Sequence, residues 1–576
     1  MTTAGETPLV HEEFVPIAMR DGTLLAASVT RPAGDGPFAT VLTRTPYDRT
    51  NQRVNGVAWA NAGYAFVRQD VRGRFDSQGE FWPFRDDPTD GYDTIEWIAQ
   101  QPWSDGRVGT TGASHVGTVQ YLLAPTRPPN LAAAIPEFAP VSVYDRWWYH
   151  GGAFRIGFNL AWITMLSVDN LRHFPERTAS LMEAREQLWV TPSAMRALEP
   201  LTLFREWTPL HYPVSEGVFG NDWYRQFMAH PSRDAFWDHV DFRMQHAEMD
   251  APMLHVGGWY DTFCQGTIDS FTGLRANART PEARAGQRLI MGPWRHVNWG
   301  EQTVGEIDYG PGLLEVNPFE TRRRFFDRHL RGIDNGTDAD KPVRIFTMGE
   351  NAWHGYDAWP LPNTQPVAYY LQPGGGLAPA AAAGEQALTF HYDPNDPVPT
   401  LGGCEWVNFP CGPFDHAPLD GRPDILRFQT EPLDADIEVT GQVFARLRVA
   451  SSARDTDFTA KLIDVHPDGR AYNLCDGIVR ARYRNGFDRE ALLTTGEQVE
   501  LEIDLWSTSN LFQRGHRIRL DVSSSNFPRF APNANTGEPP FNFRPGEERR
   551  IGAENTVFVG GANGSRVVLP VIPRSR

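Results

Sequence analysis

The chain has 576 residues and a mass of 64.7 kDa, and its hydrophobic (41%) and aromatic (12%) fractions exclude a single small module and a disordered chain. The formal net charge of −17 disfavours nucleic-acid binding, which needs clustered Lys and Arg. Four cysteines without metal-ligand spacing exclude a disulfide framework and a zinc knuckle. Residues 1–14 show no signal peptide, and no apolar run reaches about 18 residues. We therefore expect a cytoplasmic protein without a membrane span.

The first third of the chain alternates short apolar runs with amphipathic ones. Strands are expected within 36–47, 62–72, 107–112 and 131–138, and helices at 91–100 and 116–123. This alternation is typical of a parallel sheet with helices on both faces.

From about residue 143 the pattern changes. Residues 144–239 are rich in Trp, Phe, Met, Leu and Arg with helical periodicity, which predicts a helical insertion. The strand-and-loop pattern then returns at 252–261 and 288–294. A helix is expected at 321–332, where Gly332 is the kind of residue that commonly follows a helix end.

Beyond about Asn351, Pro and Gly become frequent and short alternating strands dominate, as at 440–449, 458–465 and 517–523. Such strands predict a β-sandwich or jelly roll. The low-complexity segment 373–384 is expected to be a solvated loop. The predicted organisation is 1–143 and 240–350 for an α/β domain, 144–239 for its insertion, and 351–576 for a β domain.

A serine lies between a predicted strand and a predicted helix, in the segment GASHVG at 112–117. Small residues beside such a serine are typical of a nucleophile elbow, a strained turn that exposes the hydroxyl. The usual spelling is GxSxG, whereas here the second glycine lies one position later. A plain helix cap is the alternative interpretation of Ser114.

Two further residues make a catalytic interpretation of Ser114 stronger. Asp261 and His296 each follow a predicted strand, and the order Ser, Asp, His is that of the α/β-hydrolase fold. An imidazole takes the proton of a serine hydroxyl, and a carboxylate orients that imidazole. A loop carboxylate and a capping histidine are the alternative interpretations of Asp261 and His296. Their coincidence at three strand ends in this order is improbable.

The backbone N–H of His115 is expected to supply half of an oxyanion hole, because it follows the serine directly. The side chain of His115 should point away from Ser114. Tyr47 follows an early strand and is placed to supply the other half. Its alternative interpretation is an ordinary packed tyrosine at a loop end.

At these residues the sequence resembles the CocE/NonD family of serine hydrolases, which includes cocaine esterases, α-amino-acid ester hydrolases and Xaa-Pro dipeptidyl-peptidases. The resemblance spans nearly the whole chain. The segments that carry it are 45–48, 70–73, 77–81, 105–109, 112–117, 258–261, 292–296, 326–332, 456–462 and 523–528. One departure is His115, where the family usually has Tyr.

The resemblance implies an α/β-hydrolase domain, a helical cap inserted after its sixth strand, and a C-terminal jelly roll that helps to close the active site. It implies that Ser114, Asp261 and His296 form a catalytic triad. Tyr47 and the N–H of His115 would then form the oxyanion hole.

The positions two and three residues after Asp261 bear on the substrate. In the α-amino-acid ester hydrolases these positions carry carboxylates that bind an ammonium group, but here they are Phe263 and Cys264. Burying a cation without a charged partner costs roughly several kcal/mol of free energy. An amino-acyl substrate is therefore less favoured, unless a carboxylate of the insertion replaces them. Phe263 suits an apolar or aromatic acyl group, and Trp162 and Trp406 are further candidate pocket walls, with core packing as their alternative.

The function expected from the sequence is that of a carboxylic-ester hydrolase that needs no metal and no cofactor. A peptidase or amidase using the same three residues is the first alternative, and a catalytically silent sugar- or peptide-binding protein is a remote one. The expected partner is a small-molecule ester, with no nucleic acid and no membrane. The sequence does not fix the oligomeric state, for which a homodimer is one candidate.

Overall fold

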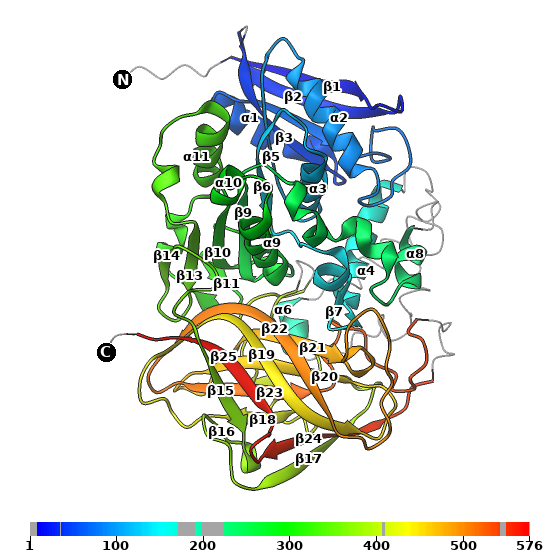
Figure 1. Ribbon diagram of the computed structural model, residues 1–576, viewed down its shortest axis with the longest axis vertical. Coiled ribbons are helices and arrows are strands. Elements are labelled where there is room, and N and C mark those ends of the chain that lie inside the picture. Colours follow the sequence, from blue (N-terminus) through cyan, green and yellow to red (C-terminus); the bar gives the residue numbers. More distant parts are fainter. Residues whose placement is uncertain are drawn as a thin grey trace.

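The computed structural model describes residues 8–34, 36–170, 191–197, 223–405, 409–541 and 549–574. Two parts are visible in Figure 1: a sheet flanked by helices, and below it a group of long strands from the last third of the chain. No helix among the described residues is both long and apolar enough to cross a membrane.

Ten strands of the described chain form one sheet, in the order β1-β2-β4-β3-β5-β6-β9-β10-β13-β14. The run from β4 to β13 is parallel, whereas β1, β2 and β14 pair antiparallel at the edges. The strands are β1 (Leu9–Ala18), β2 (Leu24–Pro32), β3 (Phe38–Thr45), β4 (Ala65–Asp70), β5 (Ser104–Ala113), β6 (Leu131–Glu137), β9 (Leu254–Tyr260), β10 (Arg288–Arg295), β13 (Val343–Thr347) and β14 (Ala352–Tyr356).

Helices cover both faces of this sheet, as the alternation of strand side chains shows. On β3, Val41 packs in one core cluster with Trp59 and Phe326, while the next residue, Leu42, packs in another with Ile95. Consecutive strand residues point to opposite faces, so these clusters lie on opposite sides. The helices are α1 (Arg53–Asn61), α2 (Asp87–Ala99), α3 (His115–Leu123), α9 (Cys264–Asn277), α10 (Pro281–Ala285) and α11 (Pro318–Arg331).

The parallel centre of the sheet was expected, but its antiparallel edges were not. No strand was expected within residues 1–14, yet β1 begins at Leu9. Most of β1 is exposed on both faces, so it lacks the alternation that marks a half-buried strand. The last strand, β14, lies beyond the predicted division at residue 350.

The segment between β6 and β9 is helical over most of its described residues. A two-residue turn at Gly151 and Gly152, which have φ of 54° and 80°, also joins a short hairpin that periodicity did not predict. The elements are a π-helical turn (Tyr144–Trp148), β7 (Tyr149–His150), β8 (Ala153–Phe154), α4 (Ile156–Asn170), α6 (Pro192–Arg196), α8 (Trp223–Ala229) and two 3₁₀ helices (Ala235–Val240, Phe242–Glu248).

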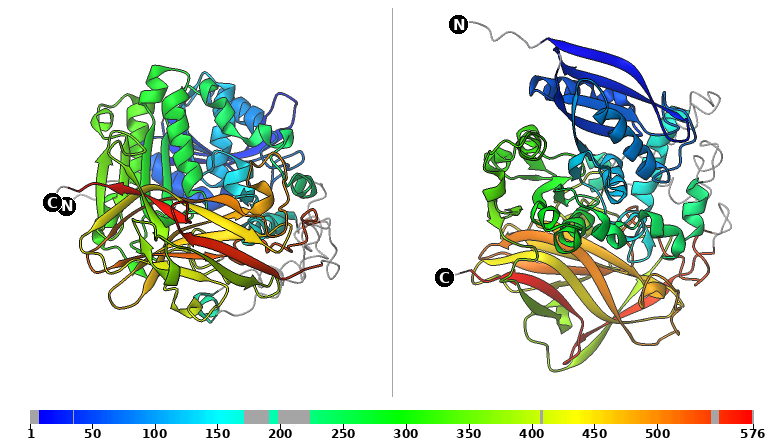
Figure 2. Two further views of the ribbon diagram at one scale, coloured as in Figure 1. Left: turned by 60° about the horizontal axis from the view of Figure 1, so that its bottom comes forward. Right: turned by 45° about the horizontal axis from the view of Figure 1, so that its top comes forward.

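The last third of the chain forms two antiparallel sheets. One has the order β16-β15-β25-β19-β24-β17, with β22 also paired to β19, and the other has the order β18-β23-β20-β21. The strands are β15 (Gln365–Leu371), β16 (Leu377–Ala378), β17 (Glu385–Tyr392), β18 (Leu426–Gln429), β19 (Ile437–Ser451), β20 (Asp457–Val465), β21 (Ala471–Arg480), β22 (Val499–Phe512), β23 (Arg517–Ser523), β24 (Ala553–Gly560) and β25 (Arg566–Ile572). Figure 2 shows from two further directions that these strands lie together beneath the first sheet.

The segment 373–384 is not wholly a solvated loop. It contains β16, in which Leu377 is buried and Ala378 pairs with Tyr370 of β15. Backbone pairing requires no side-chain alternation, so a two-residue strand in a Gly- and Ala-rich segment leaves little signal in the sequence.

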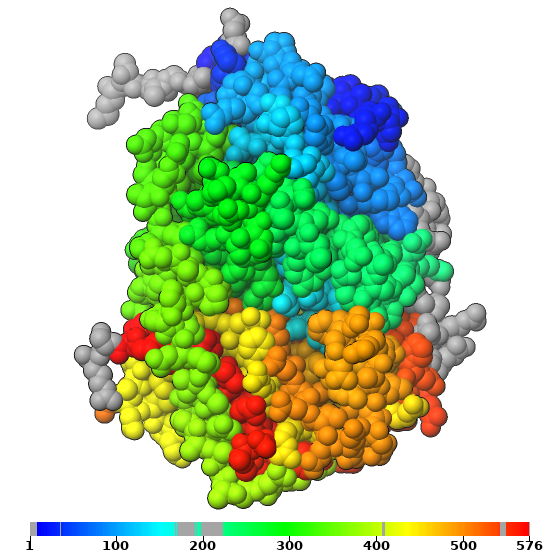
Figure 3. Space-filling view, viewed as in Figure 1, coloured from blue at the N-terminus to red at the C-terminus, as the bar shows by residue number. Residues whose placement is uncertain are grey.

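The two parts of the molecule share a continuous core, and Figure 3 shows them in contact along a broad boundary. Trp259 of β9 belongs to the same buried cluster as Leu447 of β19 and Leu462 of β20. The Cys404 thiol donates to the Trp259 carbonyl at 3.2 Å. Because this shared cluster is apolar and buried, the C-terminal strands support the sheet directly.

Candidate active site

Ser114 stands at the turn between β5 and α3 with φ of 64° and ψ of −129°, a conformation that costs a non-glycine residue energy. Its hydroxyl makes no capping hydrogen bond to α3, so the helix-cap interpretation is wrong. A Cβ at Gly112 would lie 2.2 Å from Val116 Cγ1, and one at Gly117 would lie 2.8 Å from the carbonyl oxygen of Glu137. The two glycines are therefore required by close packing around the turn.

The structure brings the hydroxyl of Ser114 to the imidazole of His296 and that imidazole to Asp261. His296 Nε2 lies 2.9 Å from Ser114 Oγ, and His296 Nδ1 lies 2.7 Å from Asp261 Oδ1. All three side chains are buried. Each follows a strand of the parallel centre (β5, β9 and β10), whose carboxyl ends meet at one edge of the sheet.

Tyr47 lies two residues beyond the end of β3, at the same edge. The indole N–H of Trp162 donates to Tyr47 Oη at 2.8 Å. Burial raises the pKa of Tyr47 to about 12, although hydrogen bonds with Trp162 and Ser114 oppose this rise. The phenol therefore remains protonated at neutral pH, and its own proton is available to an acceptor near Ser114.

His115 begins α3, so its backbone N–H has no acceptor within the helix. Its side chain points into an aromatic cluster, where the ring stacks on Phe84 with centroids 4.8 Å apart. Neither ring nitrogen has a hydrogen-bond partner in the described structure, and burial lowers the pKa of His115 to about 3. Because the ring makes no hydrogen bond to Ser114, whose hydroxyl lies beside His296 instead, His115 is not placed to act as the base for Ser114.

A cavity of about 440 Å³ opens beside Ser114, Tyr47 and His296. Its other lining residues are Thr43, Thr45, Gln52, Asn55, Trp59, Phe66, Thr111, Gly112, Ala113, Val116, Glu137, Met165, Val297, Phe319 and Arg322. The wall is thus mixed, with aromatic side chains and uncharged polar groups. Thr111 Oγ1 is buried there without a hydrogen-bond partner in the described chain.

One carboxylate and one guanidinium line this cavity, and they bind each other. Arg322 Nε and its terminal nitrogen donate to the two oxygens of Glu137, the second at 2.7 Å. Glu137 is almost fully buried. The pair is bidentate, so binding an ammonium group at Glu137 would require displacing Arg322.

The structure describes two of the three predicted pocket residues, Phe263 and Trp162. Phe263 is fully buried and packs edge-on against His296, with centroids 5.2 Å apart. Trp162 is also buried and contacts Tyr47 as described, and neither side chain lines the cavity beside Ser114. Trp406 lies outside the described residues.

Sequence reasoning missed several residues around Ser114. Glu137 ends β6 and so shares the strand-end position that identified Ser114, Asp261 and His296. That position was a usable signal for Glu137. Arg322 and Met165 gave no such signal, because their approach to the cavity depends on how α11 and α4 pack.

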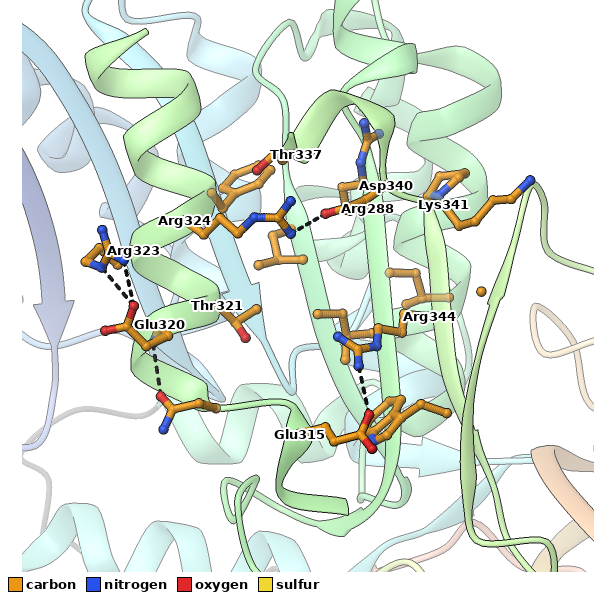
Figure 4. Close-up of a pocket in the computed structure, with 18 of the residues that line it drawn as sticks. Arg288, Glu315, Glu320, Thr321, Arg323, Arg324, Thr337, Asp340, Lys341 and Arg344 are labelled. Carbon is orange, nitrogen blue, oxygen red and sulfur yellow. Dashed lines mark hydrogen bonds and ion pairs between the residues drawn. The ribbon is translucent and has the colours of Figure 1, made fainter. Parts of the chain in front are cut away.

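A larger cavity, of about 580 Å³, lies between α11 and the strands β10, β13 and β14. Figure 4 shows its charged walls, where Arg324 contacts Asp340 and Arg344 faces Glu315 at 3.7 Å. It contains none of the residues that the sequence predicted for catalysis, and its cations have acidic neighbours. The residues predicted for catalysis therefore lie at the smaller cavity, not at this one.

Comparison with known proteins gives consistent results over the whole chain. The family model described as X-Pro dipeptidyl-peptidase (S15 family) matches residues 21–298, and that described as X-Pro dipeptidyl-peptidase C-terminal non-catalytic domain matches residues 335–568. The sequence is 37% identical to a cocaine esterase of Rhodococcus sp. (strain MB1 Bresler), over 97% of this chain and 98% of that one.

Two solved structures are similar over nearly their full lengths. An α-amino acid ester hydrolase has a TM-score of 0.82 and 27% identity, covering 99% of this chain and 98% of its own. An aminopeptidase from a marine sediment Thaumarchaeota archaeon has a TM-score of 0.81 and 27% identity, covering 97% of each chain.

Proposed function

Because the chain belongs to the CocE/NonD family of serine hydrolases, with an α/β-hydrolase-like first part and a mostly β C-terminal part, we propose that it hydrolyses carboxylic esters through an acyl-enzyme on Ser114. The observation that carries the proposal is the continuous contact from Ser114 Oγ through His296 to Asp261, at 2.9 and 2.7 Å. This arrangement suits proton transfer from a nucleophilic hydroxyl.

The proposed reaction has two steps. Ser114 Oγ attacks the ester carbonyl as His296 Nε2 takes its proton, and the carbonyl oxygen becomes an oxyanion held by the Tyr47 O–H and the His115 N–H. When the C–O bond breaks, His296 gives its proton to the leaving alcohol. Water, deprotonated by His296, then attacks the acyl-enzyme and releases the acid, which restores Ser114.

The charges near Ser114 support a neutral acyl group. Phe263 and Cys264 cannot pair with an ammonium group, and the carboxylate in the cavity wall, Glu137, is bound by Arg322. Trp59 and Phe319 supply an apolar wall. We therefore propose apolar or aromatic acyl groups, for which the predicted pocket residues Trp162 and Phe263 would act from behind Tyr47 and His296.

The proposal also covers the helices between β6 and β9, the C-terminal sheets, the cellular location and the oligomeric state. The helices between β6 and β9 act as a cap, and the two C-terminal sheets form a jelly roll that helps to close the site. A cytoplasmic location is supported by the four cysteines, which are all buried and form no disulfide in the described structure. A homodimer remains a prediction.

Cleavage of peptides or amides is the second candidate. It is favoured by the peptidase descriptions of both matching family models and by the similarity to the archaeal aminopeptidase. The same triad serves both reactions, so the substrate must decide between them.

The experiment compares p-nitrophenyl acetate, butyrate and benzoate with phenylalanine and glycyl-prolyl anilides, using wild type and Ser114→Ala. We expect ester turnover that the variant loses, with the anilides uncleaved. Preferential anilide cleavage would move the protein to the peptidase alternative. If no substrate reacts, labelling of Ser114 by a fluorophosphonate distinguishes a narrow hydrolase from a binding protein, since only the hydrolase reacts covalently.

A further inference from the structure

Two histidines and an aspartate meet at one end of the smaller C-terminal sheet, outside the cavity that Ser114 lines. Asp464 and His466 lie at the end of β20, and His516 directly precedes β23. Val465 pairs with Arg517, so continuing this antiparallel register by one residue sets His466 opposite His516. Asp464 and His466 are two residues apart and share a face, which brings all three side chains together.

The potential ligand atoms of these three residues all lie within 4.8 Å of one another. His516 Nδ1 is 2.8 Å from Asp464 Oδ1, and His466 Nε2 is 3.9 Å from Asp464 Oδ2. The two imidazole rings are 4.4 Å apart between centroids. Zinc ligands lie about 2.0–2.2 Å from the ion, so small side-chain rotations bring one oxygen and two nitrogens to that distance.

The ion pair between His516 and Asp464 does not account for the position of His466 beside them. The ring of His466 makes no hydrogen bond within the described residues, although it faces both partners. Asp464 is almost fully buried, and Asn510 Nδ2 donates to its Oδ2 at 3.3 Å. Such a donor orients a carboxylate in the way that outer hydrogen bonds orient metal ligands.

A cavity of about 230 Å³ adjoins the cluster. Its walls come from both parts of the molecule, with Tyr260, Tyr309 and Met348 on one side and Asn510 and Gln513 on the other. The cavity provides a path for an ion and room for a water molecule as fourth ligand. It also places the cluster at the junction between the first sheet and the C-terminal strands.

We propose that Asp464, His466 and His516 bind one divalent transition-metal ion, with zinc as the probe of choice. Two imidazoles favour zinc and its neighbours over Ca²⁺ and Mg²⁺, which prefer oxygen ligands. The ion stabilises the junction and takes no part in ester hydrolysis. An ion that binds only the folded chain raises its melting temperature in proportion to the logarithm of its concentration above Kd.

The test uses the full chain after treatment with a chelator. Isothermal titration with Zn²⁺ should give one site per chain, and the melting temperature should rise with zinc. His466→Ala should lose both effects, and because its ring also packs against Tyr472 with centroids 5.1 Å apart, its melting temperature with zinc is compared with that of the same variant without zinc. His391→Ala is the matched control, since His391 forms an exposed pair with Glu554 at 2.6 Å and should bind zinc as wild type does.

Two results would overturn the proposal: zinc binding by His466→Ala that equals wild type, or no saturable zinc binding by wild type. Cobalt gives a readout that does not depend on any variant. Co²⁺ held by the three residues and water should show the strong visible absorption of a four-coordinate ion. A spectrum like that of Co²⁺ in water would contradict the proposed coordination.

Discussion

The molecule contains two buried histidine–aspartate pairs of nearly equal geometry in different surroundings. His296 and Asp261 are 2.7 Å apart at the edge of the first sheet, and His516 and Asp464 are 2.8 Å apart at the end of the smaller C-terminal sheet. In the first pair the free nitrogen of the histidine faces a serine hydroxyl, whereas beside the second pair lies another imidazole.

This difference shows that the third group determines what such a pair can do. A hydroxyl beside the imidazole gives a proton to it and becomes a nucleophile. A second imidazole has no proton that the first can usefully take, but together with the carboxylate it offers a set of metal ligands. Of the two pairs, the first also lies beside the predicted oxyanion donors, Tyr47 and the N–H of His115.

The largest expected effect comes from the carboxylate of the first pair. Asp261→Asn should lower kcat for ester hydrolysis by about 10⁴-fold, because the amide favours the wrong tautomer of His296. The measurement is steady-state hydrolysis of a p-nitrophenyl ester. Glu554→Gln, at the exposed pair with His391, is the control and should retain wild-type kcat. A loss below tenfold in Asp261→Asn would contradict the assignment.

The next effect tests the oxyanion donors, which the second pair lacks. Tyr47→Phe should lower kcat by about 10²–10³-fold with little change in KM, because the donor acts on the transition state. Tyr92→Phe on α2 should leave both constants unchanged. Equal kcat in Tyr47→Phe and wild type would show that the phenol does not hold the oxyanion.

A third prediction concerns the turn that presents Ser114, which has no counterpart at the second pair. Gly117→Ala would place a Cβ 2.8 Å from both Ala139 Cβ and the Glu137 carbonyl oxygen. We expect the free energy of unfolding to fall by about 1–3 kcal/mol, measured in urea. Gly421→Ala, where a Cβ meets nothing within 4 Å, should change it little. Equal stability of both variants would contradict the packing argument.

The last prediction concerns His115, a histidine with no carboxylate partner. Burial lowers its pKa from 6.5 to about 3, so between these pH values the unfolded chain binds a proton that the folded chain does not. The free energy of unfolding therefore decreases as the pH falls from 6.5 toward 3. His115→Phe should reduce the slope of unfolding free energy against pH in this window by up to about 1.4 kcal/mol per pH unit. Parallel slopes for variant and wild type would rule this out.

Strand ends made the core of the site predictable from the sequence. Ser114, Asp261 and His296 each follow a buried apolar strand, and carboxyl ends of parallel strands meet at one edge. Tyr47 followed from the same rule. The central strands were predictable because they are buried on both faces and bounded by turn residues.

Other features depend on contacts that no local pattern records. The edge strand β1 is largely exposed, and Arg322 reaches the cavity only through the packing of α11 against β6. His466 and His516 meet because β20 and β23 pair in a particular register, although β21 and β22 intervene in the chain. Such pairings require the tertiary structure.

The C-terminal strands hydrogen-bond to residues close to Asp261 in the chain, and this has a consequence for synthesis of the protein on the ribosome. Tyr260, just before Asp261, donates to the Asn473 carbonyl at 2.9 Å, and Gln265, just after it, accepts from Ser507 at 2.7 Å. A nascent chain therefore contains all of its reacting groups long before it contains the segments that fix the carboxylate. We therefore expect full activity only in a chain that contains Asn473 and Ser507.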